Sequence, residues 1–198
     1  MIHFPNEILS IIINELTALA DEKDSLAALA SCRLTCHTFC SIATPLLFSS
    51  ITLTDDEPSY YTGSSYEAAI PLIRAVNLNE ILIHKQDIAT SVRTLVLKLK
   101  SHTDLIGGDI IASILARLPY IEALTLEVLK SNYPLEWNKI SRDLSSAIQA
   151  LFRSDHLTKL DLFNFSDFPL ILITNCTNLQ YLRLSRIRFS VKSPLFIF

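Results

Sequence analysis

Apolar residues near the start of the chain recur at helical spacing. Four of them repeat at intervals of one, three and four positions, so they share one helical face: Ile8, Leu9, Ile12 and Leu16. Pro5 suits the first turn of such a helix, because its missing N–H would be unpaired there anyway. The pattern predicts an amphipathic helix over residues 5–19.

Two shorter helical patterns follow a charged break at residues 20–24. The second predicted helix ends near Cys32. The third covers about residues 34–43, and Pro45 is expected to end it because proline cannot continue the backbone hydrogen bonding. Together the three patterns predict a small helical domain over residues 1–50.

A different frame, apolar-x-x-apolar-x-Leu, recurs in the rest of the chain. Its five occurrences begin at Phe48, Val92, Ile121, Leu157 and Leu179. Residues two apart face the same side of a strand, so each frame predicts a strand with paired inward side chains. Helical patterns lie between frames, at residues 109–118 and 140–152. Strands joined by crossover helices form a parallel sheet with helices on one side, which predicts an irregular α/β solenoid over residues 51–198.

The alternate strand positions are expected to face outward and to mix charged with aromatic side chains. They are Arg93, Thr94, Val96, Lys98, Glu122, Thr125, Glu127, Lys159, Asp161, Phe163, Tyr181, Arg183 and Ser185. Such a mixture fits a recognition surface, and it also fits a plain solvent-exposed sheet face. Polar segments at residues 55–65, 101–108 and 131–139 are predicted loops. The apolar residues 193–198 predict an array without a polar cap, whose edge is adhesive.

Charge and composition exclude several classes of partner. The net charge is −3 and the basic residues are scattered, so neither a nucleic acid nor an anionic membrane surface is expected as a partner. Residues 34–54 carry no charge, but Pro45 and many hydroxyl and thiol groups argue against a membrane span. Only three glycines occur, which disfavours a glycine-rich phosphate loop.

The cysteines indicate buried thiols and not a metal site. Cys32, Cys36 and Cys40 are four residues apart, which places them along one face of a helix. Such a series cannot wrap a tetrahedral zinc ion, so core or half-buried thiols are predicted and no metal or other cofactor is expected. Unpaired thiols fit a reducing compartment, the cytoplasm or the nucleus.

The first fifty residues resemble an F-box in their order of motifs. The matching segments are Phe4-Pro5-Asn6-Glu7-Ile8-Leu9, Ile12, Leu16, Leu26, Leu29, the run from Ser31 to Phe39, Ala43, Pro45-Leu46-Leu47-Phe48 and Ile51-Thr52-Leu53. Phe4 replaces the usual leucine, and Phe39 stands where many members carry tryptophan. The frames that follow resemble the divergent leucine-rich repeats found after an F-box in many fungal proteins. Where those repeats place asparagine or cysteine, this chain has Lys100, Leu129, Phe165 and Ile187.

The resemblance implies a substrate-recruiting subunit of a ubiquitin ligase that is not itself an enzyme. F-box helices dock on a Skp-type adaptor and through it on a cullin, while the second domain holds a protein substrate. The resemblance assigns adaptor binding to Phe4, Pro5, Glu7, Ile8, Leu9, Ile12, Leu16, Leu26 and Leu29. Candidate substrate-binding residues are Lys98, Glu127, Phe163, Tyr181 and Arg183.

Two other hypotheses are open. The repeats can serve as an interaction scaffold that never joins a ligase. A hydrolase using His37 or His156 is the other alternative. The adjacent Ser154, Asp155 and His156 are better explained as a turn, because a catalytic triad needs convergence in space and not adjacency in sequence.

Overall fold

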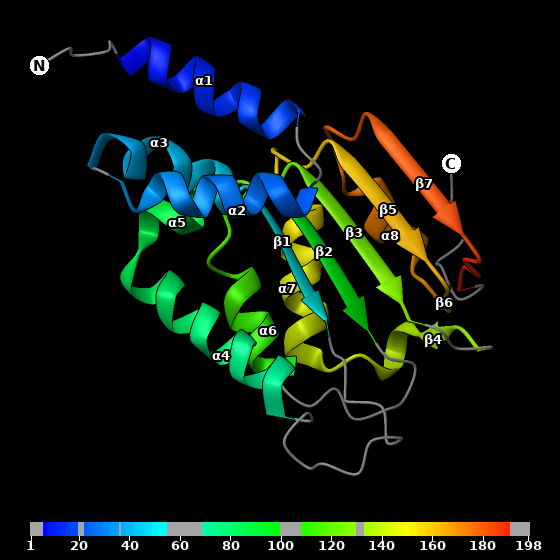
Figure 1. The fold of residues 1–198 in the computed structure, drawn as a ribbon. Helices are drawn as coiled ribbons and strands as arrows, with labels where there is room; N and C mark the ends of the chain where they lie inside the picture. The colour runs from blue at the N-terminus through cyan, green and yellow to red at the C-terminus, as the bar shows by residue number, and fades with distance from the viewer. Residues whose placement is uncertain are drawn as a thin grey trace, which may run out of the picture. The chain divides into compact units, whose positions relative to one another are not determined.

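The computed structural model divides into two compact units, Met1–Ser50 and Ile51–Phe198. These are the bounds given above to the two predicted domains. The residues that the structure describes are 6–19, 22–35, 37–54, 69–99, 108–129 and 133–190. Figure 1 labels the elements of both units.

Three helices build the first unit: α1 (Asn6–Leu19), α2 (Glu22–Arg33) and α3 (His37–Leu47). Each helix supplies one residue to a buried centre, namely Ile13, Leu29 and Ala43. The partly buried side chains around this centre belong to Cys32, Phe39, Ile42, Leu46 and Leu47. The small Ala43 allows α3 to approach its neighbours closely, so a short sequence can still form a dry contact among three helices.

The third helix differs from its prediction at both ends. It begins at His37 and not near Leu34, because Leu34 N donates to Ser31 O at 3.1 Å in a turn that closes α2. Pro45 does not end it but lies inside its last turns. Proline removes a single N–H there, and Phe48 N still donates to Thr44 O at 3.1 Å, so helical bonding continues past Pro45.

The predicted single stripe of cysteines is wrong, because the turn after α2 separates two of its members. Cys32 lies on α2 and Cys40 on α3, and both are half-buried free thiols. Cys40 Sγ lies 3.7 Å from Thr44 Oγ1 one turn later. Cys36 lies outside the described residues.

A five-stranded sheet forms the second unit, in the order β1-β2-β3-β5-β7. Its strands are β1 (Ser50–Thr54), β2 (Thr94–Leu99), β3 (Ala123–Val128), β5 (Lys159–Phe163) and β7 (Tyr181–Ser185). The last two apolar positions of every predicted frame therefore lie on one strand, and neighbouring strands from β2 to β7 run parallel. The frames are also in register, since Leu95, Leu124, Leu160 and Leu182 lie side by side.

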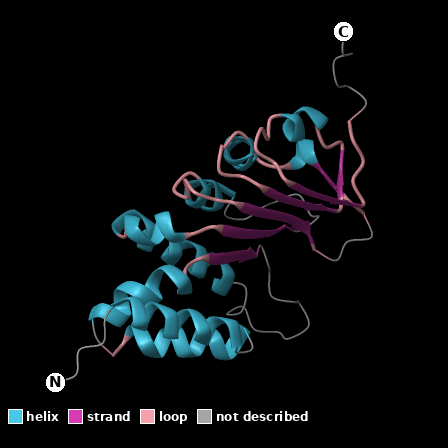
Figure 2. Ribbon diagram, turned by 90° about the horizontal axis from the view of Figure 1, so that it is seen from above, coloured by secondary structure: helices cyan, strands magenta, loops and turns pink. Residues whose placement is uncertain are grey.

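The helices of this unit gather on one face of the sheet, as Figure 2 shows from above. They are α4 (Ala69–His84), α5 (Gln86–Ser91), α6 (Gly108–Leu115), α7 (Arg142–Phe152) and α8 (Leu170–Thr174). The crossover helices predicted at residues 109–118 and 140–152 are confirmed as α6 and α7, whereas α4, α5 and α8 were not predicted. The helix α6 packs between α4 and α7, and α7 contacts α8. Beneath them Leu95, Leu97 and Leu99 are fully buried.

One hydrogen-bonding arrangement repeats where the chain enters the strands β3, β5 and β7. A single carbonyl accepts two consecutive N–H groups of the next repeat. Arg93 O accepts from residues 122 and 123, Glu122 O from residues 158 and 159, and Thr158 O from residues 180 and 181, at 2.8–3.0 Å. These bonds pair backbone N–H groups just before the strand, where the hydrogen bonds of the sheet have not yet begun. They also fix the register of each of these strands relative to its neighbour.

Aromatic residues fill the interior beyond the carboxyl ends of the strands. The predicted loop at residues 131–139 contains β4 (Leu135–Glu136) and a 3₁₀ helix (Trp137–Lys139), and β4 pairs with β6 (Phe165–Ser166). The Trp137 and Phe168 ring centroids lie 4.8 Å apart, edge to face, and Phe165 and Phe168 lie 5.9 Å apart. Phe165 is thus completely buried and held by packing against other aromatic rings.

Candidate functional site

An apolar stripe on α1 is left uncovered in the first unit. Ile8, Ile11 and Ile12 are 42%, 56% and 46% exposed, whereas the adjacent Ile13 is completely buried. Helix α1 therefore packs on its own unit through one face and presents isoleucines on another. Three exposed isoleucines within five positions form a contiguous surface, unlike the single exposed apolar residues that are normal on soluble proteins. We call Ile8, Ile11 and Ile12 the α1 stripe.

The other residues assigned to adaptor binding fall into three groups. Glu7 is exposed and Leu9 half-buried beside the α1 stripe. Leu29 is only 3% exposed and belongs to the three-helix centre, so it supports the helices and is not part of their surface. Phe4 and Pro5, and the side chains of Leu16 and Leu26, lie outside the described part of the chain.

The second unit carries an open sheet face opposite its helices. Alternate strand residues form three rows across this face, aligned by the register. The rows are Thr94, Ala123, Lys159 and Tyr181; Val96, Thr125, Asp161 and Arg183; and Lys98, Glu127, Phe163 and Ser185. The described helices of this unit all lie on the other face, and every side chain of these rows except Asp161 is half-buried or exposed.

Cations and aromatic rings pair on the β5–β7 side of the open sheet face. Lys159 Nζ lies 5.0 Å from the centre of the Tyr181 ring, and Arg183 Cζ lies 5.1 Å from that of Phe163. Each pair crosses from one strand to the next, so the cations hold the rings against the sheet. Tyr181 remains 48% exposed. The result is a broad amphipathic surface whose aromatic and arginine side chains are of the type enriched in protein interfaces.

Asp161 lies at the centre of this cation–aromatic group. It is only 8% exposed, and its Oδ2 lies 3.8 Å from Lys159 Nζ. Its other oxygen, Oδ1, is buried and has no hydrogen-bond partner among the described residues. An acceptor buried without a hydrogen-bond partner costs about 1–3 kcal/mol. Because this oxygen is buried, Asp161 acts on the sheet face through its ion pair with Lys159 and is not itself exposed to a partner.

The structure brings all five candidate substrate-binding residues onto the open sheet face. Lys98, Glu127 and Phe163 are neighbours in one row, and Tyr181 and Arg183 lie on the adjoining strand β7. Two other residues that were predicted to face outward lie apart from the rows. Arg93 and Glu122 precede their strands and pair with each other, Nε to Oε1 at 3.2 Å.

Sequence reasoning missed the residues that follow β5 and β7. Asn164, Arg186 and Arg188 line a hollow beyond the strand ends together with Pro134 and Ile187. The sequence carried only a weak signal there, two arginines separated by one residue after the last frame. The three segments that line the hollow are about 20 to 50 residues apart in sequence, around residues 134, 164 and 187. The spacing of residues along the chain therefore does not predict that they lie together.

The residues considered for catalysis or metal binding lie in a turn and in packing contacts, and the described ones do not form a catalytic or metal-binding arrangement. Ser154, Asp155 and His156 form the turn between α7 and β5, where Ser154 Oγ accepts from His156 N at 3.3 Å. The His156 ring packs edge-on against Tyr120 at 5.0 Å. No group of histidine, cysteine and carboxylate side chains in the described residues is arranged to hold a metal ion. Burial raises the pKa of the Cys176 thiol, which keeps this group protonated and unreactive at neutral pH.

Comparisons with family models, with curated proteins and with solved structures found no match to this chain. Among the described helices, none combines the length and the hydrophobicity that crossing a membrane requires.

Proposed function

We propose that this chain is an F-box-type subunit that recruits a protein substrate to a cullin ubiquitin ligase through a Skp-type adaptor. The observation that carries the proposal is the α1 stripe: Ile8, Ile11 and Ile12 lie exposed on a helix whose own unit does not cover them. Fully burying an isoleucine contributes about 1.5–3 kcal/mol, so covering three half-exposed ones is a substantial driving force for docking.

The second unit supports the proposal as a divergent leucine-rich repeat array. Its frames share one register, and the same carbonyl device recurs at the entry to three strands. The unit departs from those repeats in its interior. Aromatic rings pack around Phe168 where leucine-rich repeats have a row of hydrogen-bonded asparagine or cysteine side chains. Because packing can define the spacing between repeats as well as a polar ladder does, the departure is compatible with a repeat array.

The open sheet face is the proposed substrate-binding surface. Its cation–aromatic pairs, Lys159 with Tyr181 and Arg183 with Phe163, offer aromatic contact area next to positive charge. The mechanism needs no bond chemistry from this chain. Holding a substrate beside a ubiquitin-loaded enzyme makes transfer effectively intramolecular and raises its rate through local concentration. Such an assembly would operate in the cytoplasm or the nucleus.

Co-purification with a Skp-type adaptor tests the proposal. We expect the intact chain to retain the adaptor and the double variant Ile8→Asp, Ile12→Asp to lose more than about tenfold of its affinity, because charges would be buried in an apolar contact. The matched control is Ile83→Asp, which changes an isoleucine of α4 that is 47% exposed. Failure of the intact chain to bind the adaptor, or equal losses in both variants, would contradict the proposal.

A scaffold that binds proteins without joining a ligase is the second candidate. The cation–aromatic pairs of the open sheet face favour it, because they are built independently of α1. One experiment distinguishes the ligase subunit from the scaffold. A partner whose capture requires Tyr181 and Arg183, recovered from a chain that never retains the adaptor, assigns the scaffold function.

A further inference from the structure

The strand β7 lies at one end of the five-stranded sheet, and among the described residues no strand lies beside its outer edge. Figure 1 shows β7 in orange at this end of the sheet. All of its side chains are exposed or half-buried, whereas Leu160 and Leu162 of the neighbouring β5 are completely buried. An uncovered edge strand is a template on which another chain can add a strand.

The backbone of β7 uses only every second residue to pair with β5. Tyr181 N donates to Thr158 O at 3.0 Å, and Ser185 O accepts at 2.9 Å from the residue that follows β5. Backbone groups of successive strand residues point to opposite sides, so the odd-numbered residues of β7 face β5. The N–H and C=O groups of Leu182 and Leu184 consequently face the outer edge, where an added strand would pair with them.

The side chains of β7 are of two chemical types, one on each face of the sheet. Tyr181 and Arg183 lie on the open sheet face, while Leu182 and Leu184 lie on the same side as the buried leucines of β5. Residues opposite each other in a sheet point to the same face, so an added strand would place its alternate side chains beside these two sets. The edge therefore favours a segment in which apolar residues alternate with polar ones.

The charge around β7 favours acidic residues as the polar ones. Arg183, Arg186 and Arg188 lie on β7 or within three residues of its end. No acidic residue follows Asp167 in the sequence, although the whole chain has a net charge of −3. None of the three arginines takes part in the ion pairs found among the described residues. A carboxylate opposite Arg183 would have its Cβ about 5 Å away, within reach of a long side chain.

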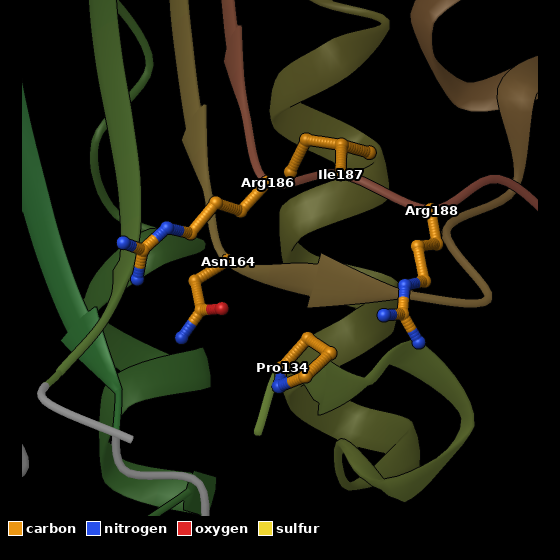
Figure 3. A pocket seen from close by; sticks show the side chains of 5 residues that line it. All are labelled: Pro134, Asn164, Arg186, Ile187 and Arg188. Atoms are coloured by element: carbon orange, nitrogen blue, oxygen red, sulfur yellow. The ribbon is translucent and has the colours of Figure 1, made fainter. Parts of the chain in front are cut away.

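The arginines after β7 spread this positive charge along the chain. Figure 3 shows the Arg186 and Arg188 side chains extending to opposite sides, with Asn164 and Pro134 between them. Guanidinium groups held apart in this way do not converge on one small anion. They suit carboxylates spaced along an extended segment, where residues on the same face follow each other at intervals of about 7 Å.

We propose that β7 binds an extended segment of a partner protein by strand addition, and that acidic and apolar residues alternate in this segment. The inference rests on the function proposed for the second unit and names the chemistry of the substrate segment. A second copy of this chain fits less well, because its own β7 would bring further arginines to an edge that has no acidic residue.

Fluorescence anisotropy of a labelled peptide titrated with the full chain tests the proposal. The peptide alternates glutamate with valine over about eight residues, enough for a strand of typical length. We expect saturable binding, at least about tenfold tighter than that of a peptide with the same residues grouped into two blocks, which cannot place the two types on opposite faces. A counterpart with lysine in place of glutamate should bind far more weakly, because it meets the arginines with like charge.

Backbone pairing has a second signature that side chains alone would not produce. N-methylation of every second peptide residue removes the N–H groups from one edge of the peptide strand only. One of the two methylated isomers should lose binding and the other should retain it, because a single edge of the peptide pairs with β7. Equal affinities of the two isomers, or of the alternating and block peptides, would overturn strand addition.

Substitutions in the chain test the role of charge. Arg183→Gln should weaken binding of the alternating peptide about tenfold, since it removes the cation of β7. The matched control Arg117→Gln removes the same charge from an exposed arginine after α6, and it should bind the peptide as the unmodified chain does. Thermal melts check that both variants are folded. Equal weakening in both, or no saturable binding by the unmodified chain, would overturn the proposal.

Other occupants of the edge would be recognised in the same titration, and each would overturn the proposal. Binding that appears only after removal of residues 191–198 would show that the chain's own segment covers β7. A dimer that the peptide does not dissociate, detected by light scattering at the titration concentrations, would assign the edge to a second copy. Competition by oligouridylate as strong as by the peptide would show a general polyanion surface. No adaptor is present in these titrations, so their failure is distinct from a failure of adaptor binding.

Discussion

Single side chains determine how the interior beyond the strand ends is filled. Phe168 is completely buried and its ring contacts those of Trp137, Phe165 and Phe152, at centroid distances from 4.8 to 6.3 Å. One residue therefore joins the 3₁₀ helix, β6 and α7. The sequence identified Phe165 only as a departure from a repeat consensus, because a contact among four distant rings leaves no periodic signal.

Replacing Phe168 by alanine is expected to cost about 3–5 kcal/mol in the free energy of unfolding, since it removes a large ring and leaves a cavity. Urea denaturation followed by far-UV circular dichroism measures the change. Phe163→Ala is the matched control: that ring lies half-buried on the open sheet face, and its loss should cost clearly less. Similar losses for both substitutions would show that the aromatic cluster is not a centre of stability.

Helices and strands could be predicted from the sequence where their apolar residues recur with a strict period. The apolar-x-x-apolar-x-Leu frames identified the five strands of the main sheet, because the two-residue period of a strand is a local property. The helix α4 was missed because its apolar residues are spread around the helix and do not form one stripe. The error at Pro45 has another cause: Pro45 lies two residues before the end of α3, so the helix loses one N–H there, and the bond from Phe48 N to Thr44 O continues the helical pattern beyond it.

The beginning of α7 offers a test at the level of an element. Ser141 caps this helix, and its side chain accepts from Leu144 N at 3.4 Å. Ser141→Ala is expected to lower the free energy of unfolding by about 1 kcal/mol, within the range for lost caps. Ser145→Ala, inside the same helix, should be neutral or slightly stabilising because alanine has the higher helix propensity. Thermal melts of the two variants compare them directly; indistinguishable midpoints would speak against the capping role.

At the scale of the whole molecule, apolar side chains remain exposed on β7, the last strand in the order of the five-stranded sheet. Leu182 and Leu184 of β7 are both 41% exposed, although their register partners Leu160 and Leu162 are completely buried. The prediction of an adhesive edge rested on residues 193–198, which lie outside the described part of the chain. The exposed leucines of β7 support the same expectation from described residues.

Self-association through this edge is therefore expected at high protein concentration. Leu184→Lys should raise the monomer fraction, because a charge on an edge strand opposes pairing with another chain. Size-exclusion chromatography with light scattering, over a range of concentrations, measures the fraction. Ile83→Lys changes an apolar residue of α4 that is exposed to a similar degree, and it should have no effect. A chain that is monomeric throughout the range would contradict this expectation.

Local patterns in the sequence were enough to predict the three short helices, the five strands of the main sheet and two of the helices between them. They were enough because the periods of helices and strands are properties of neighbouring residues. Which members of equivalent frames are buried depends instead on the tertiary structure. Leu160 and Leu182 occupy the same frame position, yet a helix layer covers one and not the other. It also placed Asp161 among cations and brought Asn164, Arg186 and Arg188 to one hollow, since register and packing join segments that no local pattern connects.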